Sequence, residues 1–306
     1  MRAELNAKEA ALGEPAWNHR YLDANGIEVH YVRHGSGPPL ILLHGWPEFW
    51  LVWRKNILPL AEHFDVVVPD LRGFGDTEKP GLPDPPSRLL DDFVEDLRGL
   101  ADGLGFEKFG VVSHDVGAYV AQGFAWKYPD RLTGLFFFNC PYPGIGRRWV
   151  EPDQVNEIWY QTFNQQPWVA SLVGENPKTC VTYIRHFLDH WAHEPGFFDQ
   201  DLDAWVENFM KPGNLQGGFN WYIATNESRI GLIRHGPPEQ PKIEIPTRVL
   251  WGVSDSVLKV EWADRLGDYF ADCKFTSAPD AGHFVHYEKP DLANRAIAKF
   301  FGIRER

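Results

Sequence analysis

The stretch Phe109–Val120 constrains the fold more than any other part of the chain. It opens with a short apolar run rich in β-branched residues, which predicts a buried strand, and Ala118–Lys127 then repeats apolar residues at helical spacing. Asp115 lies at the junction, with Ser113 two positions before it and Gly117 two positions after it. Small residues at these offsets permit a sharp strand-to-helix turn that lifts the central side chain above a sheet. The sequence therefore predicts a nucleophile elbow in which Asp115 takes the place usually held by serine.

Two other interpretations of this turn are available. Aspartate is a favoured N-cap residue, so Asp115 alone is also compatible with a simple helix cap. Ser113 is the second candidate nucleophile, but its own offsets hold Val111 and Asp115, which do not meet the requirement for small residues. The register therefore fits Asp115, and the remainder of the chain favours a nucleophile over a cap.

Apolar runs typical of buried strands alternate with helical segments on both sides of the elbow. The expected strands are residues 27–32, 40–43, 65–70, 109–114, 132–138, 247–252 and 274–277, and the expected helices include 50–62, 89–104 and 118–127. This alternation predicts an α/β fold with a mostly parallel central sheet that helices flank on both faces. Residues 1–20 are polar and aperiodic, and we expect a loosely ordered arm there.

The texture of the chain changes between residues 142 and 241. Strand-like runs stop, and helical segments dense in tryptophan take their place. We interpret 142–241 as a helical cap domain inserted into a core domain formed by residues 1–141 and 242–306.

Composition excludes several classes of function. The 306 residues carry a formal net charge of −12, which argues against nucleic acid or an anionic membrane surface as a partner. The first residues lack the apolar segment of a signal peptide, and no apolar run approaches the ~18 residues of a membrane span. Three widely spaced cysteines suggest neither a disulfide framework nor a metal cluster. A cytoplasmic protein is expected, and a homodimer is compatible with the sequence.

Two further residues complete a catalytic set with Asp115. Asp255 follows one predicted strand, and His283 follows the last one. The order nucleophile, acid, histidine is that of α/β-hydrolases, and the carboxyl ends of parallel strands are where such sites collect. Asp280 is a weaker candidate for the acid because it lies only three residues from His283, and Asn139 is a neutral alternative for orienting the histidine.

The segment His44-Gly45-Trp46-Pro47 follows a predicted buried strand. There the backbone N–H of Trp46, together with that of Val116 directly after the nucleophile, would form an oxyanion hole. One such donor contributes on the order of 10²–10³ in rate. The bland alternative is a loop that ends in proline.

From residue 25 to residue 303 the chain resembles the α/β-hydrolase superfamily, and within it the epoxide hydrolases. The resemblance is carried by 44–47, Arg72-Gly73-Phe74-Gly75-Asp76-Thr77, Ser113-His114-Asp115-Val116-Gly117-Ala118, the Asp255 segment and Gly282-His283. It implies hydrolysis of an epoxide to a vicinal diol through an ester on Asp115, with water as the second substrate and without a cofactor or metal. Haloalkane and fluoroacetate dehalogenases carry similar motifs, so a dehalogenase remains an alternative, as does a non-catalytic relative that binds a ligand beneath the cap.

The cap segments discriminate between these alternatives. Epoxide hydrolases carry two cap tyrosines, and the resemblance implies Tyr160 and Tyr222 for them. Ring opening generates an alkoxide, and a phenol can donate a proton to it at neutral pH without being ionised itself. A halide leaving group has no such requirement. A packed aromatic is the plain alternative for either tyrosine taken alone.

Some residues differ from the motifs of the epoxide hydrolases and of the dehalogenases. Val116 stands where many epoxide hydrolases and haloalkane dehalogenases have tryptophan, although Trp46 is still available to grip a halide. The arginines and the His-Trp pair of fluoroacetate dehalogenases are absent at Val116, Tyr119 and Tyr160-Gln161.

The remaining expectations concern the pocket. Substrate contacts are expected from His44, Pro47, His114, Gln161, Trp221 and Phe284. The wealth of aromatic residues in the cap predicts an uncharged and fairly bulky substrate. His186, His190 and His193 have some spacing typical of metal ligands, but Phe187 stands where a zinc-protease motif needs glutamate, so a solvated helix face is the better interpretation.

Overall fold

A computed structural model describes residues 16–303 of the chain. Of the arm expected at 1–20, residues 1–15 lie outside the described residues. The expectation is wrong at its end, because His19–Ala24 forms strand β1. This strand pairs with its neighbour in register from His19 opposite Val32 to Ala24 opposite Ile27. Backbone pairing at the edge of a sheet tolerates a polar sequence, and that is why hydrophobic patterning did not indicate it.

A single eight-stranded sheet forms the centre of the molecule, in the order β1-β2-β4-β3-β5-β6-β7-β8. Strand β2 is antiparallel to both of its neighbours, and all pairs from β4 to β8 are parallel. The strands after β1 are β2 (Ile27–Gly35), β3 (Pro39–Leu43), β4 (Asp65–Pro69), β5 (Phe109–His114), β6 (Leu132–Phe138), β7 (Thr247–Gly252) and β8 (Cys273–Ala278). The predicted mostly parallel α/β sheet is confirmed.

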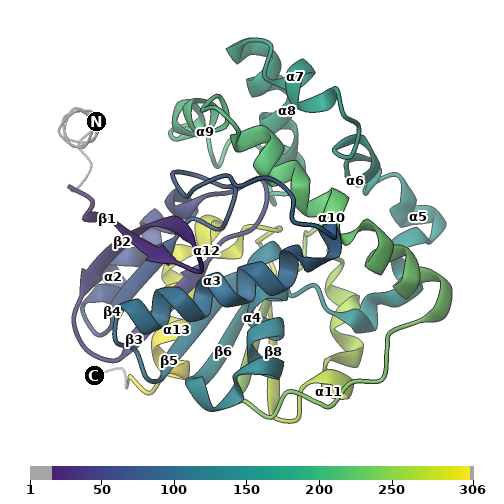
Figure 1. The fold of residues 1–306 in the computed structure, drawn as a ribbon. Helices are drawn as coiled ribbons and strands as arrows, with labels where there is room; N and C mark the ends of the chain where they lie inside the picture. Colours follow the sequence, from purple (N-terminus) through teal and green to yellow (C-terminus); the bar gives the residue numbers. More distant parts are fainter. Residues whose placement is uncertain (1–15, 304–306) are drawn as a thin grey trace.

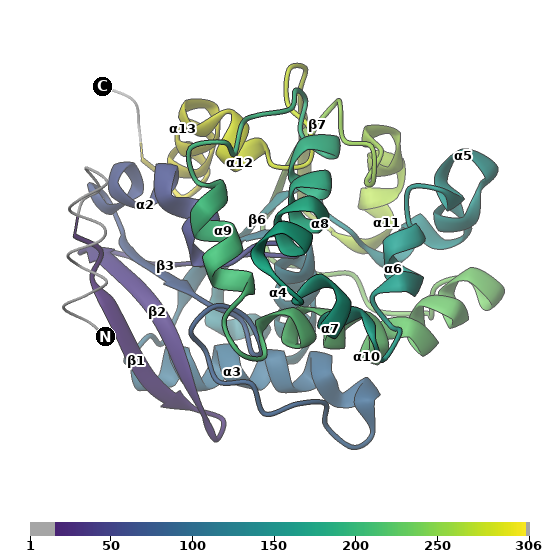
Figure 2. The same ribbon diagram turned by 90° about the horizontal axis from the view of Figure 1, so that it is seen from above.

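Helices cover both faces of this sheet (Figure 2). Helices α3 (Leu89–Gly103) and α4 (Val116–Lys127) pack together on one face, and α2 (Arg54–Ala61), α12 (Val285–Glu288) and α13 (Pro290–Phe300) pack together on the other. Because both faces are covered, the central strands are apolar throughout, and strand β4 is buried along its whole length. Short helices complete the core: η1 (Trp50–Trp53), η2 (Pro86–Arg88), η3 (Pro129–Arg131), η5 (Val260–Arg265) and α11 (Leu266–Tyr269).

The chain between β6 and β7 is helical and gathers above one end of the sheet (Figure 1). Its elements are η4 (Pro143–Val150), α5 (Pro152–Val155), α6 (Trp159–Phe163), α7 (Val169–Val173), α8 (Pro177–His190), α9 (Leu202–Phe209) and α10 (Asn214–His235). Trp46, in the loop after β3, packs against Phe187 and Trp191 from this group, so the helices lie over the carboxyl ends of the strands. Among residues 16–303, no helix combines the length and the apolar character needed to cross a membrane.

Helix α10 is in close contact with the core near its first turn. A Cβ atom on Gly217 would lie 1.9 Å from the carbonyl oxygen of Gly73, and one on Gly218 would lie 2.9 Å from the Trp46 indole. Only glycine permits this approach of two backbones. The first half of α10 is therefore fixed on the core.

Candidate active site

Asp115 stands at the turn between β5 and α4 with a backbone φ of 46°, a conformation that residues with a side chain rarely adopt. The turn is crowded by its neighbours. A Cβ atom on Gly117 would lie 2.7 Å from the carbonyl oxygen of Leu43, and one on Gly45 would lie 2.3 Å from the Cβ of Asp115. Strain of this kind persists only where the surroundings enforce it. Here glycine on both sides lets the turn hold Asp115 at the end of β5.

The two carboxylate oxygens of Asp115 have different neighbours. Oδ1 accepts a hydrogen bond of 2.9 Å from the backbone N–H of Trp46, whereas Oδ2 lies 3.9 Å from Nε2 of His283. Val116 begins α4, so its N–H belongs to the first turn, where helix amides have no partner within the helix. Burial raises the pKa of Asp115, and the charges of His283 and His114, with the Trp46 N–H, act against that rise.

His283 is fully buried, and its Nδ1 lies 2.8 Å from Oδ2 of Asp255. Burial lowers the pKa of His283, but the charge and hydrogen bond of Asp255 outweigh burial and, helped by Asp115, raise the pKa to about 9. Nε2 has no hydrogen-bond partner among residues 16–303 and is the ring nitrogen nearer to Asp115. The imidazole of His283 thus faces Asp115 from a position that the Asp255 carboxylate fixes.

Asp255 is held by four donors. Oδ1 accepts from the backbone N–H groups of Val257 and Leu258, each at 2.9 Å, and Oδ2 accepts from Nδ2 of Asn139 at 2.5 Å as well as from His283. Asn139, the alternative partner for the histidine, therefore contacts the acid and not the imidazole. Its own backbone φ of 42° is positive, and its Oδ1 accepts from a backbone N–H of β7, so Asn139 ties β6 to β7 behind Asp255.

Asp280 does not take part in this set. Its side chain is exposed in the loop after β8, although it lies close to His283 in the sequence.

Tyr160 on α6 and Tyr222 on α10 meet above Trp46. The Tyr160 ring stacks on the indole at 5.5 Å, the Tyr222 ring meets the indole edge-on at 5.4 Å, and the two tyrosine rings are 5.5 Å apart. Burial raises the pKa of both phenols well above the ordinary value, and Asp115 adds to the rise. The same tryptophan thus binds Asp115 through its backbone and supports both phenols through its side chain.

A cavity of about 630 Å³ connects these groups. Asp115, Tyr160 and Tyr222 line it together, with Gln161 and Trp221 among the walls. The remaining lining is mostly apolar or aromatic and reaches the segment that follows α10, at residues 236–240. The cavity is large enough for a small organic substrate.

Four of the residues expected to contact substrate lie outside the cavity lining: His44, Pro47, His114 and Phe284. His44 is buried, and both of its ring nitrogens contact backbone atoms. Nδ1 lies 2.9 Å from the carbonyl oxygen of Gly45, and Nε2 accepts a hydrogen bond of 3.0 Å from the backbone N–H of Leu71. The carbonyl of Pro47 accepts a hydrogen bond from Nε1 of Trp205 on α9. The structure thus gives His44 and Pro47 supporting positions, because their polar atoms are committed to other parts of the fold.

His114, directly before Asp115 in the chain, belongs to a buried group of side chains that the sequence reasoning missed. Its Nδ1 lies 2.9 Å from Oε1 of Glu48, and Nε2 of His286 lies 3.8 Å from the same oxygen. The Phe284 ring is tilted relative to that of His114, with ring centroids 5.9 Å apart. Burial raises the pKa of Glu48, but His114 and His286 outweigh it and lower that pKa to about 2. The only signal for this network in the sequence is a carboxylate in the loop after a buried strand.

Glu48, His114 and His286 are also the group that could hold a metal ion among the described residues, since their donor atoms lie within 4.8 Å of one another. Glu48 Oε2 already accepts the Gly45 N–H at 2.5 Å, and its other oxygen is at hydrogen-bond distance from His114. Glu48 thus has a protein contact at each of its oxygens, and the His286 nitrogen lies farther away, at 3.8 Å from Oε1.

The three histidines of the helical segment between β6 and β7 have different contacts. His190 Nε2 lies 2.7 Å from Oε2 of Glu157, and His193 Nδ1 lies 2.7 Å from Oγ of Ser254. His186 stacks on His190. His190 and His193 thus have different partners, which favours the interpretation of a solvated helix face over that of a shared metal site.

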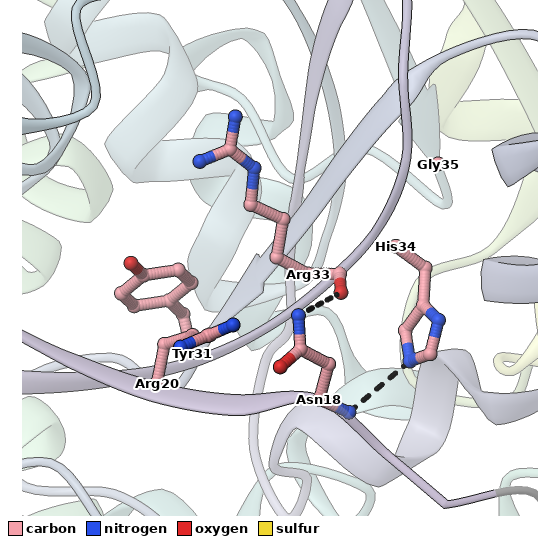
Figure 3. A pocket seen from close by; sticks show the side chains of 6 residues that line it. All are labelled: Asn18, Arg20, Tyr31, Arg33, His34 and Gly35. Atoms are coloured by element: carbon pink, nitrogen blue, oxygen red, sulfur yellow. Dashed lines mark hydrogen bonds between the residues drawn. The ribbon is translucent and has the colours of Figure 1, made fainter.

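A second pocket, of about 580 Å³, lies at the beginning of β1 and the end of β2 (Figure 3). Asn18 links the two strands there, since its Nδ2 donates to the carbonyl of Arg33 and its backbone N–H donates to Nε2 of His34. The Arg33 guanidinium is paired with Asp65. The pocket contains none of the predicted site residues, so the chemistry belongs to the cavity at Asp115.

Comparisons with known proteins show the family of the chain. A family model described as the alpha/beta hydrolase fold matches residues 38–290. The chain is 33% identical to a soluble epoxide hydrolase of Corynebacterium sp. (strain C12) over 294 residues, which cover 92% of this chain and 96% of that protein.

Solved structures show the same likeness. The structure of the epoxide hydrolase CorEH without ligand has a TM-score of 0.81 and 30% identity, covering 93% of this chain and 98% of that one. A Bacillus megaterium epoxide hydrolase in complex with an inhibitor has a TM-score of 0.80 and 26% identity, covering 92% and 99%. The chain belongs to the α/β-hydrolase family and, within it, to the epoxide hydrolases.

Proposed function

We propose that the protein hydrolyses an epoxide to a vicinal diol through a covalent ester on Asp115. The observation that carries the proposal is the meeting of Tyr160 and Tyr222 above Trp46, in the wall of the cavity that also contains Asp115. Paired phenols beside a nucleophilic carboxylate suit a reaction whose leaving oxygen stays attached to the substrate and must be protonated. The epoxide hydrolases among the relatives support the same reaction.

The neighbours of the Asp115 oxygens suggest a role for each. Oδ1 is held by the Trp46 N–H, so Oδ2 is the oxygen free to attack a ring carbon. Attack forms the C–O bond of an ester and breaks the ring C–O bond, whose oxygen takes a proton from Tyr160 or Tyr222. Oδ1 then becomes the ester carbonyl oxygen, already in the oxyanion hole formed by the Trp46 and Val116 N–H groups.

Both phenols carry their protons when substrate arrives, because burial raises the pKa of Tyr160 and Tyr222 well above the ordinary value. Gln161 Nε2 lies 3.3 Å from the Tyr160 oxygen, which leaves the hydroxyl proton free to point elsewhere. A donor to the phenol oxygen also makes the phenol a better acid.

Formation of the ester prepares the base for the second step. The negative charge of Asp115 is one of the causes that raise the pKa of His283, and the ester has no such charge. The pKa of His283 therefore falls once the ester has formed, and the imidazolium gives its Nε2 proton to the phenolate that ring opening left on Tyr160 or Tyr222. The neutral Nε2 then takes a proton from water, and the hydroxide adds to the ester carbonyl. The tetrahedral intermediate expels the diol oxygen, which takes the proton of the new carboxylic acid, so that Asp115 is again a carboxylate, His283 an imidazolium and the tyrosine a phenol.

The domain division supports this cycle. We propose residues 1–141 and 242–306 as the core domain that carries Asp115, Asp255 and His283, and residues 142–241 as the cap domain that carries the two tyrosines. We also propose a cytoplasmic location and a homodimer, which cell fractionation and light scattering would test.

A His283→Gln variant tests the proposed function. Without the base the second step stalls, so incubation with an aryl epoxide should add the whole mass of the epoxide to the intact protein. The double variant Asp115→Asn/His283→Gln is the control and should gain nothing. Tyr160→Phe and Tyr222→Phe placed on the His283→Gln background should each slow the mass gain.

A haloalkane serves as the competing substrate in the same assay. A mass gain equal to the haloalkane minus hydrogen halide, with no gain from epoxides, would assign the protein to the dehalogenases. Absence of any adduct, together with a wild-type protein that turns over neither compound, would refute a covalent mechanism and favour the ligand-binding alternative.

A further inference from the structure

Glu288, the last residue of α12, holds the loop that carries His283. Its Oε1 accepts a hydrogen bond of 3.0 Å from the backbone N–H of Phe284, and its Oε2 accepts one of 3.0 Å from that of Gly282. The backbone N–H of His283 itself donates to the carbonyl oxygen of Trp191 at 2.7 Å. Three successive N–H groups of this loop are thereby engaged. The sequence reasoning did not select Glu288.

The same carboxylate reaches the segment 191–193, which follows α8 in the proposed cap domain and is called the cap segment below. Oε2 accepts a hydrogen bond of 2.8 Å from the backbone N–H of His193. The two chains approach closely here, because a Cβ atom on Gly282 would lie 2.3 Å from the carbonyl oxygen of Trp191. Only glycine permits such an approach. Glu288 thus joins the loop of the proposed base to the cap segment.

The cap segment also contacts the base and the loop of the acid. The ring of Trp191 meets that of His283 edge-on, with centroids 5.2 Å apart. Nδ1 of His193 lies 2.7 Å from Oγ of Ser254, the residue directly before Asp255. The position of the imidazole relative to its acid therefore depends on where the cap segment lies.

The hydrogen-bond partners of Glu288 are all backbone N–H groups. Its side chain is buried, and no ion pair involves it among residues 16–303. Burial raises the pKa of Glu288, and the N–H groups of His193, Gly282 and Phe284 act against that rise. Hydrogen bonds to a carboxylate are stronger than those between neutral groups, so this contact fixes the two backbone segments firmly.

A purely structural role explains part of this pattern. Phe284 is the N-cap residue of α12, and a carboxylate near the beginning of a helix satisfies an amide there. That role does not require the bonds from Gly282 and His193, which lie outside the helix. These two bonds connect Glu288 to the catalytic loop and to the cap segment.

We propose that Glu288 is a positioning residue for hydrolysis of the ester, because it holds the His283 loop against the cap segment. This inference rests on the proposed function and assigns a further residue to its second step. Ring opening depends on Asp115 and the two cap tyrosines, and none of them shares a hydrogen bond with Glu288 among the described residues. Hydrolysis depends on His283, and a displacement of about 1 Å at a reacting group can cost roughly 100-fold in rate.

Single-turnover kinetics of Glu288→Gln separate the two steps. The variant keeps the size of the side chain but turns an NH₂ group toward N–H donors. With an aryl epoxide, and with the ester on Asp115 followed by intact-protein mass, ester decay per folded molecule should slow roughly 10- to 100-fold. Ester formation should stay near the wild-type rate. Glu244→Gln, at an exposed position before β7, is the matched control and should behave as wild type.

A second background shows whether Glu288 acts through His283. In a protein that already carries His283→Gln, adding Glu288→Gln should slow ester decay no further, because the group that it positions is absent. Further slowing there, or an equal loss of both steps in Glu288→Gln alone, would overturn the proposal. A wild-type decay rate per folded molecule, with only the free energy of unfolding reduced, would leave Glu288 a helix cap and would also overturn it.

Amide hydrogen exchange tests the contact without any chemistry. Glu288→Gln should speed exchange at 282–284 and in the cap segment and leave that of β5 unchanged, whereas unchanged exchange at all three would overturn the proposal. If Glu288→Gln does not fold, Glu288→Asp takes its place, since it keeps the charge on a shorter side chain and should slow ester decay in the same way. Failure of every epoxide to alkylate His283→Gln would instead refute the proposed function, and hydrogen exchange would then decide whether Glu288 joins the two segments.

Discussion

Replacing Asp255 with asparagine removes one negative charge from the site and hardly changes the shape of the side chain. Every polar neighbour of Asp255 is a donor: the backbone N–H groups of Val257 and Leu258, the amide of Asn139 and the Nδ1 of His283. The single side-chain oxygen of asparagine can accept from the two backbone N–H groups or from Asn139 and His283, but not from all four donors. If it faces the two backbone donors, its NH₂ group faces His283, and the imidazole must then carry its proton on Nε2.

The expected effect of Asp255→Asn on the hydrolytic step follows from the contacts of His283. Its pKa is raised from 6.5 to about 9 despite burial, which corresponds to about 3 kcal/mol of preference for the imidazolium, and Asp255 is the main cause of the rise. With Asp255→Asn the pKa of His283 falls, so charge alone would not impair the base. The wrong tautomer would impair the base, because a protonated Nε2 cannot accept a proton from water. We expect the hydrolytic step to slow by on the order of 10³–10⁴, as is typical when such an acid is replaced by its amide.

Single-turnover kinetics with an aryl epoxide would measure this effect, with the ester on Asp115 followed by intact-protein mass after rapid quenching. Ester formation should persist in Asp255→Asn, and ester decay should almost stop. Asp280→Asn makes the same chemical change at the exposed aspartate near His283 and should behave as wild type. Ester decay within tenfold of the wild-type rate, in a protein with an unchanged circular dichroism spectrum, would refute the role given to Asp255.

Two further predictions follow from the same contacts. Because neutral His283 is the proposed base, decay of the ester should slow as pH falls through the pKa that this histidine has in the ester state, and quenched samples should contain more ester at low pH; an ester fraction independent of pH would contradict this. Gly217→Ala would place a methyl group against core backbone and should reduce the free energy of unfolding in urea by roughly 1–3 kcal/mol, whereas Gly231→Ala on the same helix meets no atom within 4 Å and should raise it by roughly 0.5–1 kcal/mol.

Periodicity and turn chemistry were sufficient for much of the fold. The predicted strands 132–138 and 247–252 coincide with β6 and β7, because solid apolar runs between breakers leave little choice of structure. Strand β1 was missed because an edge strand is stabilised by pairing, and its polar residues carry no apolar pattern.

The candidate site was likewise predicted only in part from the sequence. Asp115, Asp255 and His283 could be selected because each follows a strand, and parallel strands bring their carboxyl ends together. His44 was misassigned to the pocket because its direction depends on two backbone partners, and one of them, the Leu71 N–H, is distant in sequence. Glu288 was overlooked because one of its partners, the His193 N–H, is distant in sequence, and no local pattern encodes that contact.

The backbone contact between Gly217 and Gly73 has a consequence for how such an enzyme can acquire new substrates. It divides α10 into a half that cannot vary in size and a half, from about Ser228 onward, that borders the cavity without touching the core so closely. Changes in the outer half can alter what the cavity accepts without disturbing the position of Tyr222. In this helix, the residues that position Tyr222 are therefore different from the residues whose substitution would change which substrates fit the cavity.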